Sequence, residues 1–530
     1  MLDVRSVELQ RQAEQERLDS LKTPAERNQC GQFATPPPLA LSIAQYAKEI
    51  WERPDPIRFL DPAIGTGAFF SAALQAFGRD QIEYADGVEL DPAFATAASR
   101  LWHDAGLHVS ESDFTSLEAK AGRRFNLLLT NPPYVRHHHM DWEYKTDLKR
   151  KVARRLNIQI SGLAGLYSFF LLLADSWLED GALSIWLIPS EFMDVNYGAA
   201  LREYLTTQVE LLRIHRFCPS DIQFSDALVS SAIVVFRKKK PSLDISAQMT
   251  FAGPITSPVK TANVPLSVLK TSHKWTGFPN ENGMGGLPKG QIRLGDLFKI
   301  KRGLATGSNE FFILTEHDAK AHGIPKKFQR PILPGPRFLV DDIIERDENG
   351  FPKIAPRLVL IDCPLPEVDV RDRYPQFWEY LKQGKKTGVD KAYLTSKRNP
   401  WYSQEKREAP PFLFTYMGRA VNGKQPFRVI WNQSEATAHN VYLLLYPKSE
   451  LATAFRRHHS LLSLVFEELR NLDASTLLGE GRVYGGGLHK LEPKELERVP
   501  IQHLAERLKA TADISLASCG EGNYGSDLLF

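Results

Sequence analysis

The stretch FLDPAIGTGAFFSAAL, from Phe59 to Leu74, indicates how the first half of the chain folds. Apolar residues lead into Asp61, and Gly65 and Gly67 then allow a tight backbone turn before a helical run begins near Ala68. A strand followed by a glycine-rich turn and a helix is typical of a doubly wound sheet, which binds ligands at the carboxyl ends of its strands. The spacing is neither GxGxxG nor GxxxxGK[ST], which argues against a dinucleotide or a nucleoside triphosphate.

Other apolar runs continue this alternation of strands and helices. IEYADGVELDP, FNLLLTNPPY and ALSIWLIPSEF each predict a strand, and a helix is expected from Leu163 to Glu179 before the last of them. VELLRIHRF and ALVSSAIVVFRKK predict two more strands with no helix between them, which favours an antiparallel edge. The sequence therefore predicts an α/β domain with a doubly wound, mostly parallel sheet.

Changes in composition divide the chain into four expected segments. Residues 1–27 are charged throughout and predict an N-terminal helical extension that caps the domain or contacts a partner. The α/β domain is expected over residues 28–244, ending in the charge run RKKKPSLD. Prolines and glycines become frequent over residues 245–510, which predicts a separate α+β domain, and residues 511–530 are expected to form a flexible tail.

Composition indicates the class of protein and the cellular compartment to expect. The chain has 530 residues, of which 43% are hydrophobic and 24% charged, as expected of a soluble globular protein with two or three domains. The net charge of +3 permits a nucleic-acid partner without showing one. The four cysteines have no paired spacing and are expected to be free thiols. With no signal peptide and no apolar run long enough to span a membrane, a cytoplasmic protein is expected.

Three successive strand ends carry side chains suited to an adenosyl ligand. The loop at Gly65 allows close approach, Glu89 ends the next strand and can accept both hydroxyls of a ribose, and Asp113 and Phe114 follow a third strand. An acid there can accept from an adenine amino group while the aromatic ring covers the base. Each feature alone is more often an ordinary turn or a helix cap, but their order along the chain favours a ligand site.

The segment FNLLLTNPPYVRHHHM, residues 125–140, ends a strand with a rigid corner, because prolines cannot continue a sheet ladder. Asn131 to Tyr134, after the DPAIGTG loop, resembles the catalytic motif of S-adenosylmethionine-dependent amino methyltransferases. GQFATPPPLALSIAQYA, from Gly31 to Ala47, resembles the segment before the cofactor loop in the gamma-class, Taq-like DNA adenine methyltransferases. The resemblance covers about residues 28–240 and implies a class I methyltransferase fold followed by a target-recognition domain.

The resemblance implies methyl transfer from S-adenosyl-L-methionine to the N6 amino group of an adenine flipped out of double-stranded DNA. Asn131 and the carbonyl of Pro132 would accept the hydrogens of that amino group, and Tyr134 would stack on the base. Phe224 is the candidate for the second stacking aromatic, or else a core phenylalanine ahead of a strand. The expected cofactor-binding residues are Thr35, Pro36, Asp61, Ala63, Gly65, Gly67, Glu89, Asp113, Phe114 and Asn131.

Basic residues in the second half suggest contacts with DNA. Lys299, Lys301 and Arg302 precede a glycine-containing loop, and Lys397 and Arg398 lie among aromatic residues in TSKRNPWYSQEKR. An exposed structural loop explains each segment equally well, and the bases that are read do not follow from the sequence. No metal site is expected at residues 137–139, because adjacent histidine side chains on a loop diverge.

The leading hypothesis is a DNA adenine-N6 methyltransferase that protects host DNA in a bacterial restriction–modification system. It would act in the cytoplasm at the nucleoid as a monomer or weak dimer, with any cognate restriction endonuclease acting independently. Two alternatives stay open. One is a methyltransferase for an RNA base or a protein glutamine, although such enzymes are typically small. The other is a non-catalytic DNA-binding subunit of a defence complex.

Overall fold

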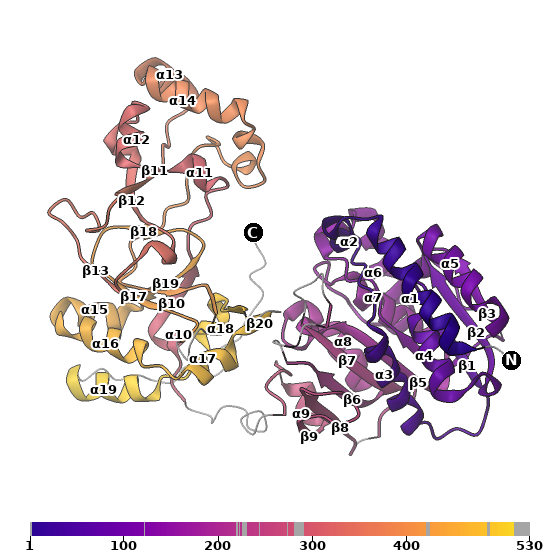
Figure 1. The fold of residues 1–530 in the computed structure, drawn as a ribbon. Coiled ribbons are helices and arrows are strands. Elements are labelled where there is room, and N and C mark those ends of the chain that lie inside the picture. Colours follow the sequence, from indigo (N-terminus) through magenta and orange to yellow (C-terminus); the bar gives the residue numbers. More distant parts are fainter. Residues whose placement is uncertain are drawn as a thin grey trace. The chain divides into compact units, whose positions relative to one another are not determined.

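The computed structural model describes residues 3–120, 122–218, 221, 223–224, 230–242, 244–272, 274–279, 291–419, 425–484 and 488–512. The chain divides into two compact units (Figure 1). The first comprises Met1–Gly286 with Tyr484–Gly486, and the second comprises Leu287–Val483 with Gly487–Phe530. The flexible tail expected over residues 511–530 lies outside the described residues from 513 onward. Within the part of the chain described, no helix has the length and apolar character that crossing a membrane requires.

A nine-stranded sheet with the order β3-β2-β1-β4-β5-β7-β6-β8-β9 organises the first unit. The five strands from β3 to β5 are parallel, and β7 lies antiparallel to both β5 and β6. The strands are β1 (Ile57–Asp61), β2 (Ile82–Glu89), β3 (Leu107–Glu111), β4 (Phe125–Thr130), β5 (Leu178–Pro189), β6 (Glu210–Arg216), β7 (Ser231–Arg237), β8 (Ser246–Phe251) and β9 (Lys260–Pro265). The expected doubly wound, mostly parallel sheet is confirmed.

Helices cover both faces of this sheet (Figure 1). The helices of this unit are α1 (Val4–Ser20), α2 (Pro24–Gln29), α3 (Pro37–Glu49), α4 (Ala68–Phe77), α5 (Pro92–Trp102), α6 (Trp142–Leu156), α7 (Leu166–Ala174), α8 (Ala199–Thr207) and α9 (Leu266–Thr271), of which α2 has no buried residue. Alternate side chains of β4 point to opposite faces. Leu127 and Leu129 join the apolar cluster that contains α3, α4 and α5, whereas Leu128 joins the cluster that contains α6, α7 and α8. Burial on both faces explains the uninterrupted apolar run of this strand.

Three sequence-based expectations about this unit were wrong: the end of one helix, the edge of the sheet and the end of the domain. The helix expected from Leu163 to Glu179 is shorter, because α7 ends at Ala174 and Leu178 already begins β5. β6 and β7 are antiparallel as expected but do not form the edge, since β8 and β9 lie beyond β6. The domain does not end at residue 244. Within the charge run, Lys238 Nζ donates to the Leu178 carbonyl at 3.0 Å, and the sheet continues after the run with β8 and β9.

The second unit is α+β, as expected, and contains three small sheets with the orders β10-β19-β15-β17-β13, β11-β14-β12-β18 and β16-β21-β20. Its strands are β10 (Phe298–Arg302), β11 (Ile313–Thr315), β12 (Gln329–Leu333), β13 (Ile343–Ile344), β14 (Leu358–Ile361), β15 (Phe412–Thr415), β16 (Met417–Arg419), β17 (Val429–Asn432), β18 (Thr437–Ala438), β19 (Tyr442–Pro447), β20 (Arg482–Tyr484) and β21 (Leu488–Lys490).

Three apolar clusters are found among the described residues of the second unit, and the smallest contains Leu333, Leu413 and Tyr442. The five-stranded sheet packs with α10 (Leu294–Leu297), α15 (Ser449–Arg457), α16 (Ser460–Arg470), α17 (Ala474–Glu480), α18 (Pro493–Glu497) and α19 (Gln502–Ala512). The four-stranded sheet packs with α11 (Asn309–Phe312), α12 (Glu316–Ala321), α13 (Glu367–Arg373) and α14 (Pro375–Lys386). Short strands and small cores explain why the sequence of this half shows no regular periodicity.

Candidate active site

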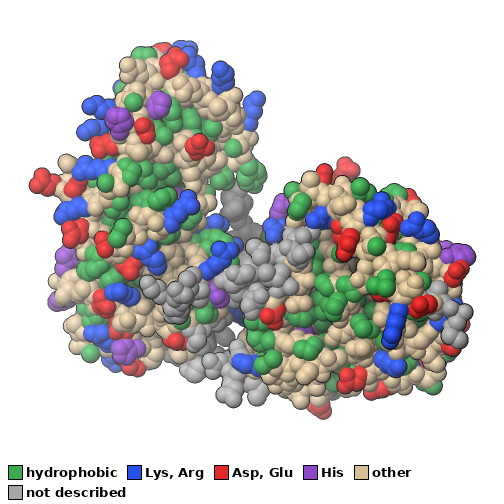
Figure 2. Space-filling view, viewed as in Figure 1, with side chains coloured by type: hydrophobic (Ala, Val, Ile, Leu, Met, Phe, Trp, Pro, Cys, Tyr) green, Lys and Arg blue, Asp and Glu red, His purple; other side chains and the backbone are tan. Residues whose placement is uncertain are grey.

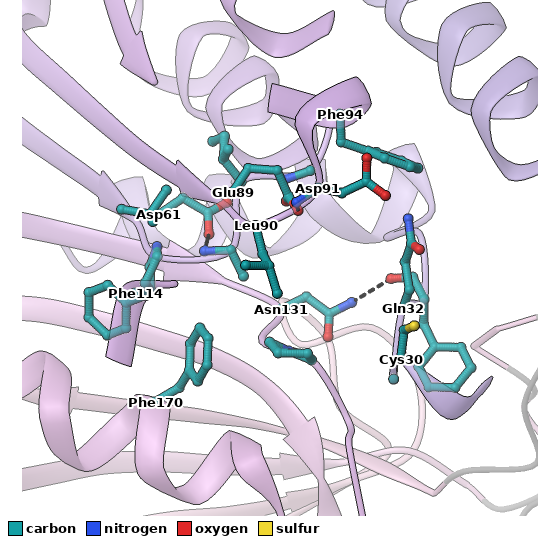
Figure 3. A pocket seen from close by; sticks show the side chains of 18 of the residues that line it. Cys30, Gln32, Asp61, Glu89, Leu90, Asp91, Phe94, Phe114, Asn131 and Phe170 are labelled. Atoms are coloured by element: carbon teal, nitrogen blue, oxygen red, sulfur yellow. Dashed lines mark hydrogen bonds between the residues drawn. The ribbon is translucent and has the colours of Figure 1, made fainter. Parts of the chain in front are cut away.

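A cavity of about 330 Å³ opens at the carboxyl ends of the parallel strands (Figure 3). This volume is within the range that suits a small-molecule ligand. Its walls come from six stretches of the chain: Gln15 and Lys22, residues 30–35, residues 61–66 with 68–69, residues 88–91 with Phe94, residues 112–114, and Asn131, Pro133 and Val135, completed by Tyr144, Leu166 and Phe170.

Glu89 links the first two strand ends. Its carboxylate accepts hydrogen bonds from the Gly65 amide and from the Asp91 amide, both at 2.9 Å. Burial raises the pKa of Glu89. Gly65 has a φ of +55°, and a side chain there would enter open space, so the glycine serves the turn and leaves room beside its backbone. The carboxylate therefore holds the glycine turn of β1 against the end of β2.

Asp61 lies at the end of β1, where it is almost completely buried. It accepts hydrogen bonds from Thr130 Oγ1 at 2.6 Å and from the Ala63 amide at 3.0 Å. Burial raises the pKa of Asp61 to about 7, despite these two hydrogen bonds. This side chain thus joins the strand that carries the glycine turn to the strand that carries Asn131.

Stability should depend on pH through Asp61. Folding raises the pKa of Asp61, so its contribution to the free energy of unfolding is complete below the unfolded pKa of about 3.9. This contribution is lost as pH rises through about 7, and the total loss is at most about 4 kcal/mol. Urea unfolding of the wild type and of Asp61→Asn at pH 5 and pH 8 should show the variant gaining relative stability at the higher pH. An equal difference in unfolding free energy between the two proteins at both pH values would contradict the raised pKa of Asp61.

Asp113 and Phe114 form the wall that follows β3. Asp113 accepts from the Thr115 amide at 2.8 Å and from Tyr144 Oη at 3.0 Å, so α6 contributes to this wall. The ring of Phe114 is buried, with centroids 5.3 Å from both Phe170 and Trp177. An acceptor thus stands beside an aromatic surface, as the sequence suggested.

Asn131 has one half of its carboxamide bound and the other half open. Nδ2 donates to the carbonyl of Phe33 at 3.0 Å and to Thr35 Oγ1 at 3.2 Å. Because the Phe33 carbonyl can only accept, these bonds fix which end of the amide faces it. Oδ1 is buried and has no hydrogen-bond partner among the described residues. An unsatisfied buried acceptor therefore lies at the cavity.

Tyr134 is locked in place by its backbone and its hydroxyl. Its amide donates to the Gly31 carbonyl at 2.9 Å, and Oη donates to the Leu187 carbonyl at 3.0 Å. Its ring centroid is 5.5 Å from Phe33 and 5.9 Å from Phe224, and these two phenylalanines are 5.7 Å apart. The three rings, Phe33, Tyr134 and Phe224, form one aromatic cluster beside the corner.

Gly31 allows the chain before α3 to pass against the corner. Its φ is +63°, and a Cβ there would lie 2.5 Å from backbone atoms of Tyr134 and Val135. Gly31→Ala is therefore expected to destabilise the protein by about 2–4 kcal/mol. Gly162→Ala is the matched control, because no atom lies within 4 Å of its added Cβ. Thermal unfolding of both variants would test this, and equal midpoints would contradict the close packing.

The structure brings together most of the expected cofactor residues but not all of them. Those that line the cavity are Thr35, Asp61, Ala63, Gly65, Glu89, Asp113, Phe114 and Asn131. Pro36, Pro132, Tyr134 and Phe224 lie outside its lining. Gly67 does not face the cavity either. With a φ of +94°, it lies against the Trp102 indole, where a Cβ would come within 2.3 Å of Nε1, so this glycine serves the packing of α4 on α5.

Sequence reasoning missed several residues of this site. Gln15 and Lys22 line the cavity from the N-terminal extension, and no local pattern marks them as cavity residues. Phe33 was overlooked although it stands within the quoted segment before α3. Tyr144 and Phe170 come from helices on the other side of the cavity, and only their contact with Asp113 and Phe114 reveals them.

The first group of expected DNA-binding residues forms a strand rather than a loop. Lys299, Lys301 and Arg302 belong to β10, which pairs with β19. Lys299 and Arg302 are both exposed, and Arg302 also lies 4.1 Å over the ring of Tyr416 and donates to the Asn440 carbonyl at 3.0 Å. On the face in Figure 2, basic side chains of this unit are scattered among acidic ones.

Lys397 and Arg398 have opposite environments. Lys397 is exposed and lies 4.3 Å over the ring of Tyr393. Arg398 instead points inward and donates to the carbonyls of Ala305 and Thr306, each at 2.7 Å. Burial lowers the pKa of Arg398. The guanidinium supports the loop after β10, and its expected role as a DNA contact stays a prediction.

The consecutive histidines form a short turn, His137–His139, whose rings contact one another. Among the described residues, no group of three or more potential ligands is arranged to hold a metal ion.

Comparisons with known proteins agree with this architecture. A family model for the C-terminal domain of type II methyltransferase M.Eco57I matches residues 288–518, and one for the Eco57I restriction-modification methylase matches residues 88–223. The type II methyltransferase M.XamI of Xanthomonas campestris pv. amaranthicola is 28% identical over 485 residues, covering 89% of this chain and 85% of that protein. M.AccI of Acinetobacter calcoaceticus is 24% identical over 512 residues, covering 94% and 90%.

The fold also resembles a solved structure of the type IIL restriction-modification enzyme MmeI in complex with DNA. The TM-score is 0.57 at 12% identity, over 92% of this chain and 69% of that chain. At this identity the likeness concerns the fold alone. The two family models lie on the two units of the chain, and both curated relatives align along nearly its whole length. Each unit of the chain therefore matches a family model of the Eco57I-type methylases, and the chain as a whole is similar to type II methyltransferases.

Proposed function

We propose that this chain transfers a methyl group from S-adenosyl-L-methionine to the N6 amino group of an adenine flipped out of double-stranded DNA. The observation that carries the proposal is Asn131 Oδ1, a buried acceptor without a partner among the described residues. A buried carbonyl oxygen is costly unless a donor satisfies it. The N–H groups of an exocyclic amino group are donors of this kind.

The residues around the cavity fit an adenosyl cofactor. Glu89 offers carboxylate oxygens for ribose hydroxyls at the end of β2, and Gly65 leaves space beside its backbone. Asp113 offers an acceptor for an adenine amino group, and Phe114 offers an aromatic surface for the ring. Asp61 would hold the amino group at the methionine end. When bound, S-adenosyl-L-methionine supplies an electrophilic methyl group on a sulfonium.

The corner at Asn131 would raise the reactivity of the target nitrogen. The lone pair of an exocyclic amine is delocalised into its ring, which makes the nitrogen a poor nucleophile. Asn131 Oδ1 and the Pro132 carbonyl would accept its two hydrogens and concentrate electron density on nitrogen. The bonds from Asn131 Nδ2 to Phe33 and Thr35, and the fixed φ angles of the prolines, hold these acceptors in advance. No covalent enzyme intermediate is needed.

The aromatic cluster of Phe33, Tyr134 and Phe224 would receive the flipped base. Stacking on an aromatic ring is worth roughly 1–3 kcal/mol per base, which is comparable to the cost of extracting a base from a duplex. The bond from Tyr134 Oη to the Leu187 carbonyl holds one ring in place, and burial raises the pKa of Tyr134, so that the ring stays neutral. Phe33 joins this cluster to the cavity.

Adenine rather than cytosine is proposed because asparagine occupies the first position of the NPPY motif, as is common in the adenine-specific enzymes that the chain resembles.

The similarity to restriction–modification methyltransferases supports a protective role for host DNA. We further propose that the chain acts as a monomer or weak dimer and that any cognate endonuclease works independently.

Contacts between the second unit and DNA phosphates should depend on exposed lysines. Lys299→Ala and Lys397→Ala are each expected to weaken DNA binding similarly on all sequences and to reduce the slope of log affinity against log salt by about 1. Arg398→Ala should instead lower stability by about 1–3 kcal/mol, because two carbonyls lose their donor. Fluorescence anisotropy over a salt series, with thermal unfolding, distinguishes them. A salt slope changed only by Arg398→Ala would contradict this division.

Incubation with radiolabelled cofactor and duplex DNA, structured RNA or a protein extract tests the activity directly. Label should enter DNA, and nucleoside mass spectrometry should show N6-methyladenine in one sequence context. N4-methylcytosine would overturn the choice of base, and label only in RNA or protein would overturn the choice of substrate. DNA binding without transfer would favour a non-catalytic subunit.

A further inference from the structure

The N-terminal helix α1 and the turn after it reach into the cavity. Gln15 of α1 and Lys22 beyond its end both line it. The helix is anchored by Leu18, which packs with Phe94 and Ala97 of α5. A helix that only covered the domain surface would not line the cavity. The polar contacts of α1 show which cavity residues it binds.

Arg11 is the central residue of this contact. Its side chain is 2% exposed, and Glu8 on the preceding turn accepts two of its hydrogen bonds, at 2.8 and 2.7 Å. Its remaining amino group, Nη1, donates to Thr66 Oγ1 at 3.0 Å. A buried guanidinium is tolerated only when its donors are satisfied in a defined geometry, so the Glu8 carboxylate aims Arg11 at Thr66.

Thr66 is the residue after Gly65 in the glycine turn. Its hydroxyl accepts from Arg11 and donates to Gln15 Oε1 at 2.7 Å, so both partners of the hydroxyl belong to α1. The Thr66 carbonyl accepts from Trp102 Nε1 at 2.9 Å. The turn at Gly65 is therefore held from one side by Glu89 and from the other side by α1.

Lys22 connects two further walls of the cavity. Its Nζ donates to Asp91 Oδ2 at 2.5 Å and to Gln32 Oε1 at 2.9 Å. Asp91 lies two residues after Glu89 and donates its amide to the Glu89 carboxylate, and Gln32 precedes Phe33. Lys22 thus ties the loop after β2 to the segment before α3.

We infer that α1 and Lys22 are a positioning element for the cofactor site, which holds the glycine turn and the Glu89 loop in their binding arrangement before the cofactor arrives. Loops that are ordered in advance lose less entropy on binding, and affinity increases accordingly. The inference rests on the proposed use of S-adenosyl-L-methionine. Arg11 and Lys22 are positioning residues, because they act through Thr66, Asp91 and Gln32.

Thr66→Val tests the Arg11 contact with little change in shape. The variant removes the hydroxyl that Arg11 and Gln15 share, and we expect it to weaken cofactor binding about tenfold in calorimetry. In the cofactor-free protein, hydrogen exchange at the amides of residues 63–67 should become faster. Arg17→Ala is the matched control, because Arg17 lies on the same helix with a side chain 57% exposed, and it should change neither quantity.

A second variant, Lys22→Met, tests the other contact independently. It should weaken cofactor binding and accelerate amide exchange at residues 89–91, while residues 63–67 keep their protection. Circular dichroism and thermal unfolding establish that both variants are folded. If folded Thr66→Val and Lys22→Met bind the cofactor as tightly as the wild type and keep its exchange pattern, the inference is overturned. If the wild type itself does not bind S-adenosyl-L-methionine, the proposed function fails, and faster exchange in the variants would still support the positioning role.

Discussion

Asn131→Ala is expected to reduce methyl transfer by about 10²–10³-fold or more, in line with the removal of a preorganised hydrogen-bonding group from an active site. Oδ1 is a buried acceptor at the cavity that has no partner among the described residues. On the proposed mechanism, its loss leaves the target amino group without the acceptor that concentrates electron density on nitrogen. Cofactor affinity should fall much less, because Glu89, Asp113 and the glycine turn stay in place.

Single-turnover methylation of duplex DNA with saturating cofactor measures this effect. Asn263→Ala is a suitable control, since Asn263 is an asparagine on β9, at the edge of the sheet away from the cavity. Calorimetry with S-adenosyl-L-methionine shows whether the variant still binds cofactor, and thermal unfolding shows whether it is folded. A folded, cofactor-binding Asn131→Ala protein that methylates DNA at the wild-type rate would refute the catalytic role.

Glu89→Ala is expected to weaken cofactor binding by about 100-fold, because hydrogen bonds to a charged group contribute roughly 1.5–3 kcal/mol each. The substitution removes the proposed acceptors for ribose hydroxyls. It also releases the amides of Gly65 and Asp91, which the carboxylate now holds at 2.9 Å, so the turn and the following loop lose a common partner. Both consequences weaken binding.

Glu83→Ala is the matched control, because Glu83 lies on the same strand with an exposed side chain. Calorimetric titration with S-adenosyl-L-methionine or S-adenosylhomocysteine compares the two variants directly. Methyl transfer at very high cofactor concentration should recover part of the wild-type rate in Glu89→Ala, since Asn131 is unchanged. An unaltered affinity in Glu89→Ala, with the loop still ordered, would mean that another residue binds the ribose.

Local chemistry was sufficient to predict the side chains at strand ends. Asp61, Glu89 and Asp113 each stand at or just after the end of a strand, and the parallel arrangement brings these ends to one edge of the sheet. All three line the cavity. Gly67 could not be assigned in this way, because its need for a glycine comes from the Trp102 indole on another helix.

The expected domain limit failed for a similar reason. The charge run after β7 has the composition of a linker, but Lys238 is bonded to the Leu178 carbonyl, and Ala247 and Met249 of β8 are buried in the same apolar cluster as Leu128 of β4. A charged turn separates two domains only when the next strand is buried in a different core. Short apolar stretches such as β8 do not reveal which core they will join.

The class of sheet and the order of the chemical groups along it follow from the amino-acid sequence alone, because strand runs, glycine turns and proline corners obey short-range rules. Three features became visible only in the folded chain: α1 supports the glycine turn through Arg11, Arg398 points inward, and Asn131 Oδ1 has no partner among the described residues while Nδ2 is bound. These outcomes depend on which distant residue occupies the space beside each group, and local preferences do not encode that.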